Sequence, residues 1–95
     1  MISNVMKLKL IALAAKHGVQ VEHFAPGKVI VSIETWQENE EQLLNLIDDL
    51  NNDENIYSIN FDPQRGFVHI EYDHNALNDQ ETINNWLRIF EKYSF

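Results

Sequence analysis

The chain has 95 residues, of which fifteen are acidic and seven basic, so its formal charge is −8. This length fits a single domain, residues 1–95, and the 44% of hydrophobic residues argues against disorder. The charge argues against nucleic acid as a partner, because surfaces that bind the phosphate backbone are basic. The absence of cysteine excludes disulfides and thiolate chemistry, and we expect a cytoplasmic protein.

Residues 1–18 predict an N-terminal helix that runs from about Ser3 to His17 and ends at Gly18. Apolar residues surround most of its circumference, which indicates packing on more than one surface. The apolar run Leu10–Ala15 is too short for the core of a signal peptide, and a membrane span needs about 20 residues. We expect no direct membrane insertion.

Residues 19–24 and 28–34 alternate as two strands of a hairpin, separated by Ala25-Pro26-Gly27. A three-residue loop would pair His23 with Val31 and keep the apolar set on one side, whereas a two-residue loop would place Glu22 opposite Val31. We therefore predict the three-residue loop. This register places His23 with the core residues and Phe24 on the other face of the sheet.

Two helices and a second hairpin follow. Thr35 and Glu38 form a capping box that predicts a helix start at Thr35, and apolar residues then recur at helical spacing as far as Asn51. Strands are predicted over 55–61 and 66–73, with Tyr57, Ile59, Phe61, Val68, Ile70 and Tyr72 facing the core. Asn78 is the predicted N-cap of a last helix that ends near Lys92.

The strands and the last helix also carry a family resemblance. The stretches His23–Val31, Asn55–Asp62 and Phe67–Asp73 resemble strands of the heavy-metal-associated domain, in particular its cysteine-less variants. The resemblance covers roughly Pro26–Tyr93. It implies a ferredoxin-like fold and a link to metal transport or homeostasis.

One part of the family pattern is absent. Its metal-binding form carries M-x-C-x-x-C, and the two cysteine positions fall near Asn39 and Gln42 in this chain. Amide side chains do not hold the soft metals that thiolates bind. We therefore predict no cofactor and no metal site.

The predicted fold class is α+β, a ferredoxin-like sandwich in the order αββαββα. The N-terminal helix occupies 1–18 and the ferredoxin-like core 19–95. We expect a four-stranded, mostly antiparallel sheet ordered 19–24, 28–34, 66–73, 55–61, with two helices on one face. The candidate interaction face is the opposite one, with Phe24, Ile30, Ile56, Phe67, His69 and Glu71.

Three occupants of that face remain open at this point: the N-terminal helix folded back over it, a second copy or protein partner, or a small molecule. Apolar residues gathered on a sheet face are typical of an interaction surface. We predict a small non-enzymatic protein-binding domain, with a homodimer or another protein as its partner. No catalytic residue is predicted, because neither His69 with Glu71 nor His23 with Glu22 has an accompanying nucleophile.

Two weaker patterns complete the sequence analysis. His69, Glu71, Asp73 and His74 are metal-binding residue types, but period-two alternation separates Asp73 from His69, so solvated polar residues are the better interpretation. The region Glu38–Glu54 is acidic and has no basic residue. An alternative function is therefore an acidic inhibitor or immunity-type protein that binds a basic partner there.

Overall fold

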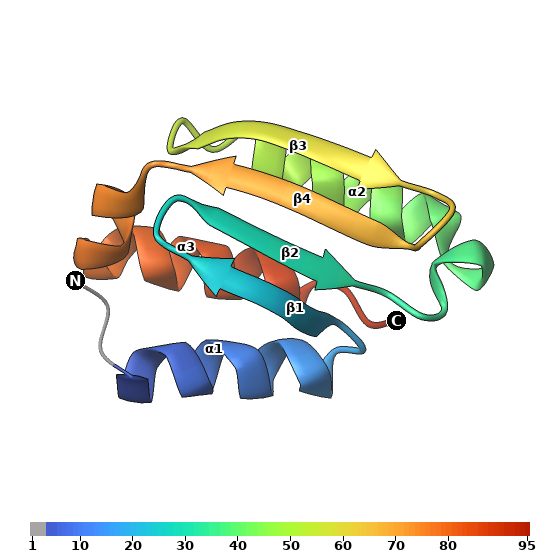
Figure 1. Cartoon of the computed structure of the whole chain (residues 1–95), viewed down its shortest axis with the longest axis horizontal. Helices are drawn as coiled ribbons and strands as arrows, with labels where there is room; N and C mark the ends of the chain where they lie inside the picture. Colours follow the sequence, from blue (N-terminus) through green and yellow to red (C-terminus); the bar gives the residue numbers. More distant parts are fainter. Residues whose placement is uncertain (1–3) are drawn as a thin grey trace.

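The computed structural model describes the backbone of residues 4–95 and the side chains of residues 8–95. Figure 1 shows α1 (Asn4–Lys16), β1 (Gln20–Ala25), β2 (Lys28–Ser32), α2 (Glu40–Asn51), β3 (Ile56–Asp62), β4 (Phe67–Tyr72) and α3 (Gln80–Glu91). Short 3₁₀ turns, η1 (Trp36–Glu38) and η2 (His74–Asn78), precede α2 and α3. The start of the predicted first helix at Ser3 lies outside the described residues.

The sheet order is β1-β2-β4-β3, and every neighbouring pair is antiparallel. This confirms the predicted α+β fold, its αββαββα order and its ferredoxin-like arrangement. β1 supplies the edge strand beside β2.

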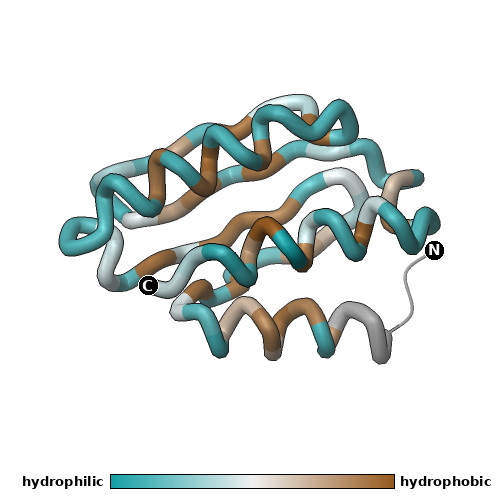
Figure 2. Tube along the Cα trace, turned by 180° about the vertical axis from the view of Figure 1, so that it is seen from behind, coloured by the Kyte–Doolittle hydropathy of each residue, from teal (hydrophilic) through white to brown (hydrophobic). Residues whose placement is uncertain are grey.

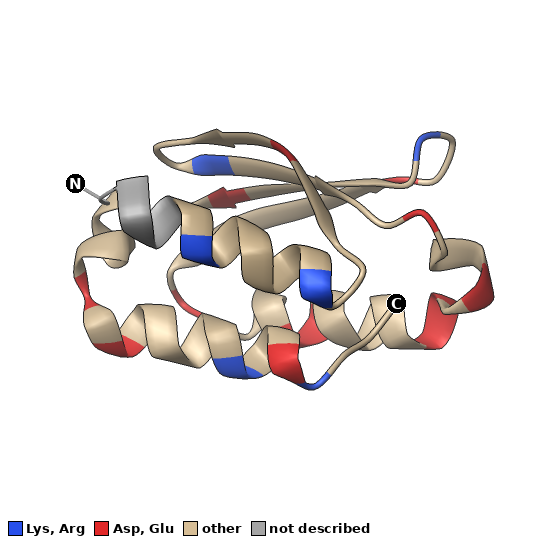
Figure 3. Cartoon of the chain, turned by 90° about the horizontal axis from the view of Figure 1, so that it is seen from below, with Lys and Arg blue, Asp and Glu red and all other residues tan. Residues whose placement is uncertain are grey.

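The three α-helices of the described residues lie on one side of the sheet, which we call its inner face. α2 and α3 cover this face, and α1 lies alongside β1 on the same side (Figures 1 and 3). Along α2 and α3, apolar residues alternate with hydrophilic ones at helical spacing (Figure 2). The buried core lies between the layers and includes Val19, Val31, Ile33, Leu43, Leu46, Leu50, Val68, Ile70, Ile83 and Ile89.

The predicted loop between β1 and β2 was wrong. Ala25 pairs with Lys28, so the turn has two residues, Pro26 and Gly27, and the φ of Gly27 is +84°. A β-bulge between Val21 and His23 then restores Val21 opposite Val31. One extra residue in a strand reverses the side-chain alternation beyond it. As a result Phe24 lies on the inner face and His23 on the other face.

A second bulge has the same effect in β3, between Ile56 and Ser58. Ile56 pairs with Tyr72 and lies on the inner face, whereas the prediction placed it on the opposite one. Tyr57, predicted to face the core, is 68% exposed. After the bulge, Ile59 and Phe61 face the core as predicted.

Both predicted helix caps were also wrong. Thr35 makes no side-chain cap; the Trp36 ring packs edge-on against Phe61 at 5.0 Å, and the chain makes a 3₁₀ turn there before α2 begins. The cap of α3 is Asp79 rather than Asn78, because the Asp79 Oδ1 atom accepts a hydrogen bond from the Glu81 N–H. Asn78 belongs to η2.

Gly66 tests the packing of Trp36 at the end of the second hairpin. A Cβ atom at Gly66 would lie 2.9 Å from Trp36 Cδ1, and its φ is +71°. We expect Gly66→Ala to lower the free energy of unfolding by about 2 kcal/mol, measured by urea denaturation.

Gly27→Ala is the matched control, because Gly27 also has a positive φ but a Cβ there would lie 3.5 Å from the nearest atom, Tyr72 O. It should cost only the backbone strain, about 1 kcal/mol. Equal losses in the two variants would contradict the tight contact between Gly66 and Trp36.

Candidate functional site

The sheet side that faces away from the helices is the outer face, and it is the candidate interaction surface. Among the described residues, no helix covers it (Figure 1). The strand registers place there the residues Gln20, His23, Lys28, Ile30, Ser32, Ser58, Asn60, Asp62, Phe67, His69 and Glu71.

Four of the six residues predicted for this surface lie on it: Ile30, Phe67, His69 and Glu71. Phe24 and Ile56 do not, because the two bulges direct them into the core. Ile30 pairs with His69, and Phe67 pairs with Ser32, so Ile30 and Phe67 are diagonal neighbours on the two central strands. Both are half-buried. The apolar part of the outer face is therefore small and central.

The charges around this centre have both signs. Lys28 and Glu71 are cross-strand partners, and His23 and His69 lie on either side of Ile30. At the β1 edge, Ser32 Oγ donates a hydrogen bond of 2.8 Å to Glu22 Oε1. A surface with an apolar centre and mixed charges around it can bind a protein.

The residues considered for metal binding do not gather at one place. Asp73 Oδ1 accepts a 2.9 Å hydrogen bond from the Asn75 N–H at the start of η2, which contains His74. His69 and Glu71 lie two residues apart on the outer face. Within residues 4–95, no three or more histidine, aspartate or glutamate side chains are arranged to hold a metal ion.

Asn39 and Gln42 correspond to the cysteine positions of the resembled family. Asn39 immediately precedes α2, and Gln42 lies in the first turn of this helix. Gln42 Nε2 donates to Asn39 Oδ1 at 3.2 Å, and Asn39 Nδ2 donates to the backbone carbonyl of Thr35 at 3.0 Å. These amides stabilise the start of the helix by bonding to each other and to the backbone.

The acidic surface of α2 contains an exposed apolar residue that the sequence analysis did not identify. Leu44 is 62% exposed, and the exposed carboxylates of Glu40 and Asp48 lie one helical turn on either side of it. Leu43 and Leu46, on the opposite side of the helix, are buried. Leu44 with its acidic neighbours therefore forms a second candidate surface.

A cleft of about 620 Å³ is lined by Asp53, Glu54, Asp73, Asp79 and Glu81 together with uncharged residues. Its aspartates already have partners: Trp86 Nε1 donates to Asp53 Oδ2 at 2.7 Å, and Thr82 Oγ1 donates to Asp79 Oδ2 at 2.9 Å. These carboxylates stabilise the ends of the helices and the turns.

The last residues join α1 to the other helices. The Phe95 N–H donates to the His17 carbonyl at 2.9 Å, and His17 Nδ1 lies 2.9 Å from the Tyr93 carbonyl oxygen. The Tyr93 hydroxyl donates to Asp49 Oδ2 of α2 at 2.5 Å. This hydrogen bond, followed by desolvation and the negative charges of Asp49 and Asp48, raises the pKa of Tyr93 to about 12.

Tyr93→Phe tests this connection. Because the folded pKa exceeds the ordinary value of 10, the stabilisation is complete below pH 10 and is lost as the pH rises through about 12. At neutral pH the variant should lose about 1 kcal/mol in chemical denaturation. The difference from the wild type should shrink between pH 10 and 12; a constant difference would contradict the hydrogen bond to Asp49.

Within the described part of the chain, no helix is long and apolar enough to cross a membrane. Comparisons with protein families, with curated proteins and with solved structures found no match to this chain.

Proposed function

We propose that this chain is a small, non-enzymatic protein-binding module that acts through the outer face of its sheet, and that a second copy of the chain is its partner. The observation that carries the proposal is the position of α1. It lies with α2 and α3 on the inner side, so the described helices leave Ile30 and Phe67 uncovered (Figure 1).

The charge pattern supports self-association through this face. A twofold interface brings the same surface of both copies together, so any charges on it must be able to pair with charges of the opposite sign on the same surface of the other copy. The outer face provides Lys28 beside Glu71, whereas the acidic residues of α2 lie on the other side of the molecule. Two copies can therefore meet here despite the formal charge of −8 on each.

The family resemblance suggests the process in which this protein contact takes place. A cysteine-less module of the heavy-metal-associated kind would take part in metal transport or homeostasis through protein contacts rather than by holding the ion. Asn39 and Gln42 support a role that does not involve holding the ion. Their amides are hydrogen-bonded to each other, and neither side chain supplies a thiolate.

A second candidate function has its own observation, the exposed Leu44 between Glu40 and Asp48 on α2. This surface suits a basic partner with one apolar anchor, as an acidic inhibitor or immunity-type protein would use. Binding of that kind weakens as salt rises, whereas an apolar contact at the outer face depends much less on salt.

Phe67→Asp tests the proposed function. In a twofold interface it would bring two carboxylates together at the apolar centre, so we expect the dimer to separate into folded monomers. Light scattering gives the mass in solution, and circular dichroism shows whether the variant is folded. A wild type that is monomeric at high concentration would contradict self-association.

Leu44→Asp is the matched control, since it makes the same kind of change at an exposed apolar residue on the opposite side of the molecule. It should leave the mass unchanged. If Leu44→Asp dissociates the dimer and Phe67→Asp does not, the interface is the α2 surface, and the first proposal is wrong.

A further inference from the structure

β3 forms one edge of the sheet, and its outer side has no neighbouring strand among the described residues. Its bulge lies at its start, between Ile56 and Ser58, and its pairing with β4 is regular from Ser58 to Asp62. β1, the other edge strand, has its bulge in the middle and α1 beside it (Figure 1). Bulges and covering helices protect sheet edges from further pairing, so β3 is the more accessible edge.

The backbone groups that β3 presents at this edge follow from the pairing of β4. The Tyr72 N–H and the Gly66 carbonyl, at the two ends of β4, bond to its β2 side at 3.0 and 3.2 Å. Because bonded residues alternate along an antiparallel strand, the even-numbered residues of β4 bond to β2. Ile59 and Phe61 pair with two of these residues. The N–H and C=O groups of Ile59 and Phe61 therefore point away from β4, to the free edge.

α2 lies on the inner side of this edge and runs antiparallel to β3 (Figure 1). Just before α2 begins, the Trp36 ring packs on Phe61 near the end of β3. After α2 ends, the Ile56 N–H donates to the Asp53 carbonyl at 3.1 Å, where the chain enters β3. The start of α2 is thus below the end of β3, and its last turn is below the start of β3.

The side of α2 below the free edge is the one turned away from α3. Asp49 marks the α3 side, because its Oδ2 atom lies 3.6 Å from Nζ of Lys92, the residue after α3. At about 3.6 residues per turn, Glu40, Leu44 and Ile47 point to the opposite side of the helix. Leu44 is 62% exposed, Glu40 is exposed and Ile47 is half-buried. Two apolar side chains and a carboxylate therefore lie below the free edge.

These groups form what we call the β3 ledge, which consists of the edge backbone of Ile59 and Phe61, the apolar residues Ile47 and Leu44, and the acidic residues Glu40 and Asp48. The side chains of the two β3 residues are only half-buried, so the inner layer is incomplete here. The region Glu38–Glu54, which contains α2, has no basic residue. The β3 ledge thus offers hydrogen bonds, an apolar strip and negative charge to one extended segment.

We propose that the β3 ledge binds an extended segment of another protein, which pairs with β3 as an added strand. Side chains alternate along a strand, so every second residue of the segment faces α2. Two apolar residues there pack on Leu44 and Ile47, and a basic residue on either side reaches Glu40 and Asp48, which gives the pattern basic-x-apolar-x-apolar-x-basic. The proposal extends the second candidate function, from which it takes the acidic surface of α2, and does not depend on the outer-face dimer.

Amide hydrogen exchange, measured by NMR on the full chain, tests strand addition with the peptide KTVTVTK, whose ends are blocked. In the free chain we expect fast exchange at Ile59 and Phe61 and slow exchange at Asn60, which points to β4. The peptide should bind saturably at low salt and slow exchange at Ile59 and Phe61 about tenfold when roughly nine-tenths of the chains are occupied. Absence of binding would overturn the proposal.

Two further outcomes would also overturn it. Binding that leaves both amides unprotected would show that the acidic surface of α2 binds a basic partner without strand addition. Protection of both amides before the peptide is added would show that a second copy already pairs with this edge. The outer-face dimer is measured separately, from the mass of Phe67→Asp, so either proposal can fail without the other.

The matched control peptide is KTPTVTK, which has the same charges but lacks one N–H that would bond to β3. Its affinity, measured by titration calorimetry, should be about tenfold lower. Equal affinities of the two peptides would contradict pairing with the β3 backbone.

Glu40→Lys tests the charge of the β3 ledge and should weaken binding of KTVTVTK about threefold. Glu91→Lys is its matched control, because Glu91 is exposed on α3 and the net charge changes by the same amount. The control should bind the peptide almost as the wild type does. Equal losses in the two variants would show that the peptide responds only to net charge, and the proposed place of binding would be wrong.

Discussion

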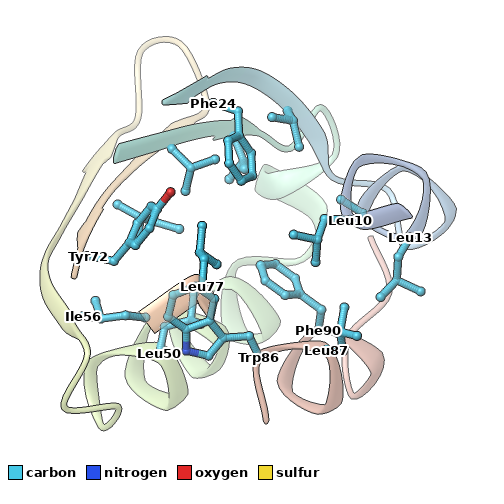
Figure 4. A pocket seen from close by; sticks show the side chains of 15 residues that line it. Leu10, Leu13, Phe24, Leu50, Ile56, Tyr72, Leu77, Trp86, Leu87 and Phe90 are labelled. Atoms are coloured by element: carbon cyan, nitrogen blue, oxygen red, sulfur yellow. The ribbon is translucent and has the colours of Figure 1, made fainter. Parts of the chain in front are cut away.

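The pairing of β1 with β2 determines the chemistry of both faces of the sheet. A tight turn at Pro26 and Gly27 and a bulge beside Glu22 together place Phe24 inside and His23 outside. The turn or the bulge alone would move part of the side chains of β1 to the wrong face, since a shift of one residue exchanges the two faces of a strand. With both, Val21 still faces the core opposite Val31. Phe24 then lines the apolar cavity between the sheet and the helices α1 and α3 (Figure 4). The outer face keeps only a small apolar centre.

The position of α1 follows from the same inner face. β1 is an edge strand, and its inward residues Val21 and Phe24 extend the apolar surface beyond the area that α2 and α3 cover. α1 packs against this extension through Leu10, Leu13 and the buried Ala14. The segment after α3 holds the end of α1 through the hydrogen bond from the Phe95 N–H to the His17 carbonyl. The helix is thereby kept off the outer face, and the space between α1 and α3 is left partly unfilled.

The predictable parts of the fold are those with a uniform register. β2 and β4 have no bulge, so simple alternation correctly placed Val31, Val68 and Ile70 inside and Ile30, Phe67, His69 and Glu71 outside. β1 and β3 each carry one extra residue, Glu22 and Tyr57, and nothing in the composition of a strand marks such an insertion. That explains why Phe24 and Ile56 were assigned to the wrong face. The start of α2 was missed because the packing of Trp36 on Phe61 outweighed a local capping pattern, and the cavity depends on tertiary packing of α1 that no local pattern encodes.

The central claim is that β1 pairs with β2 through a two-residue turn and a bulge. Cross-strand backbone NOEs between the two strands, measured by NMR, test it most directly. The account predicts contacts that join Phe24 with Val29 and Val21 with Val31, the partners in the observed register. Contacts that join His23 with Val31 and Val21 with Ile33 would contradict it. They would return Phe24 to the outer face and remove it from the cavity wall.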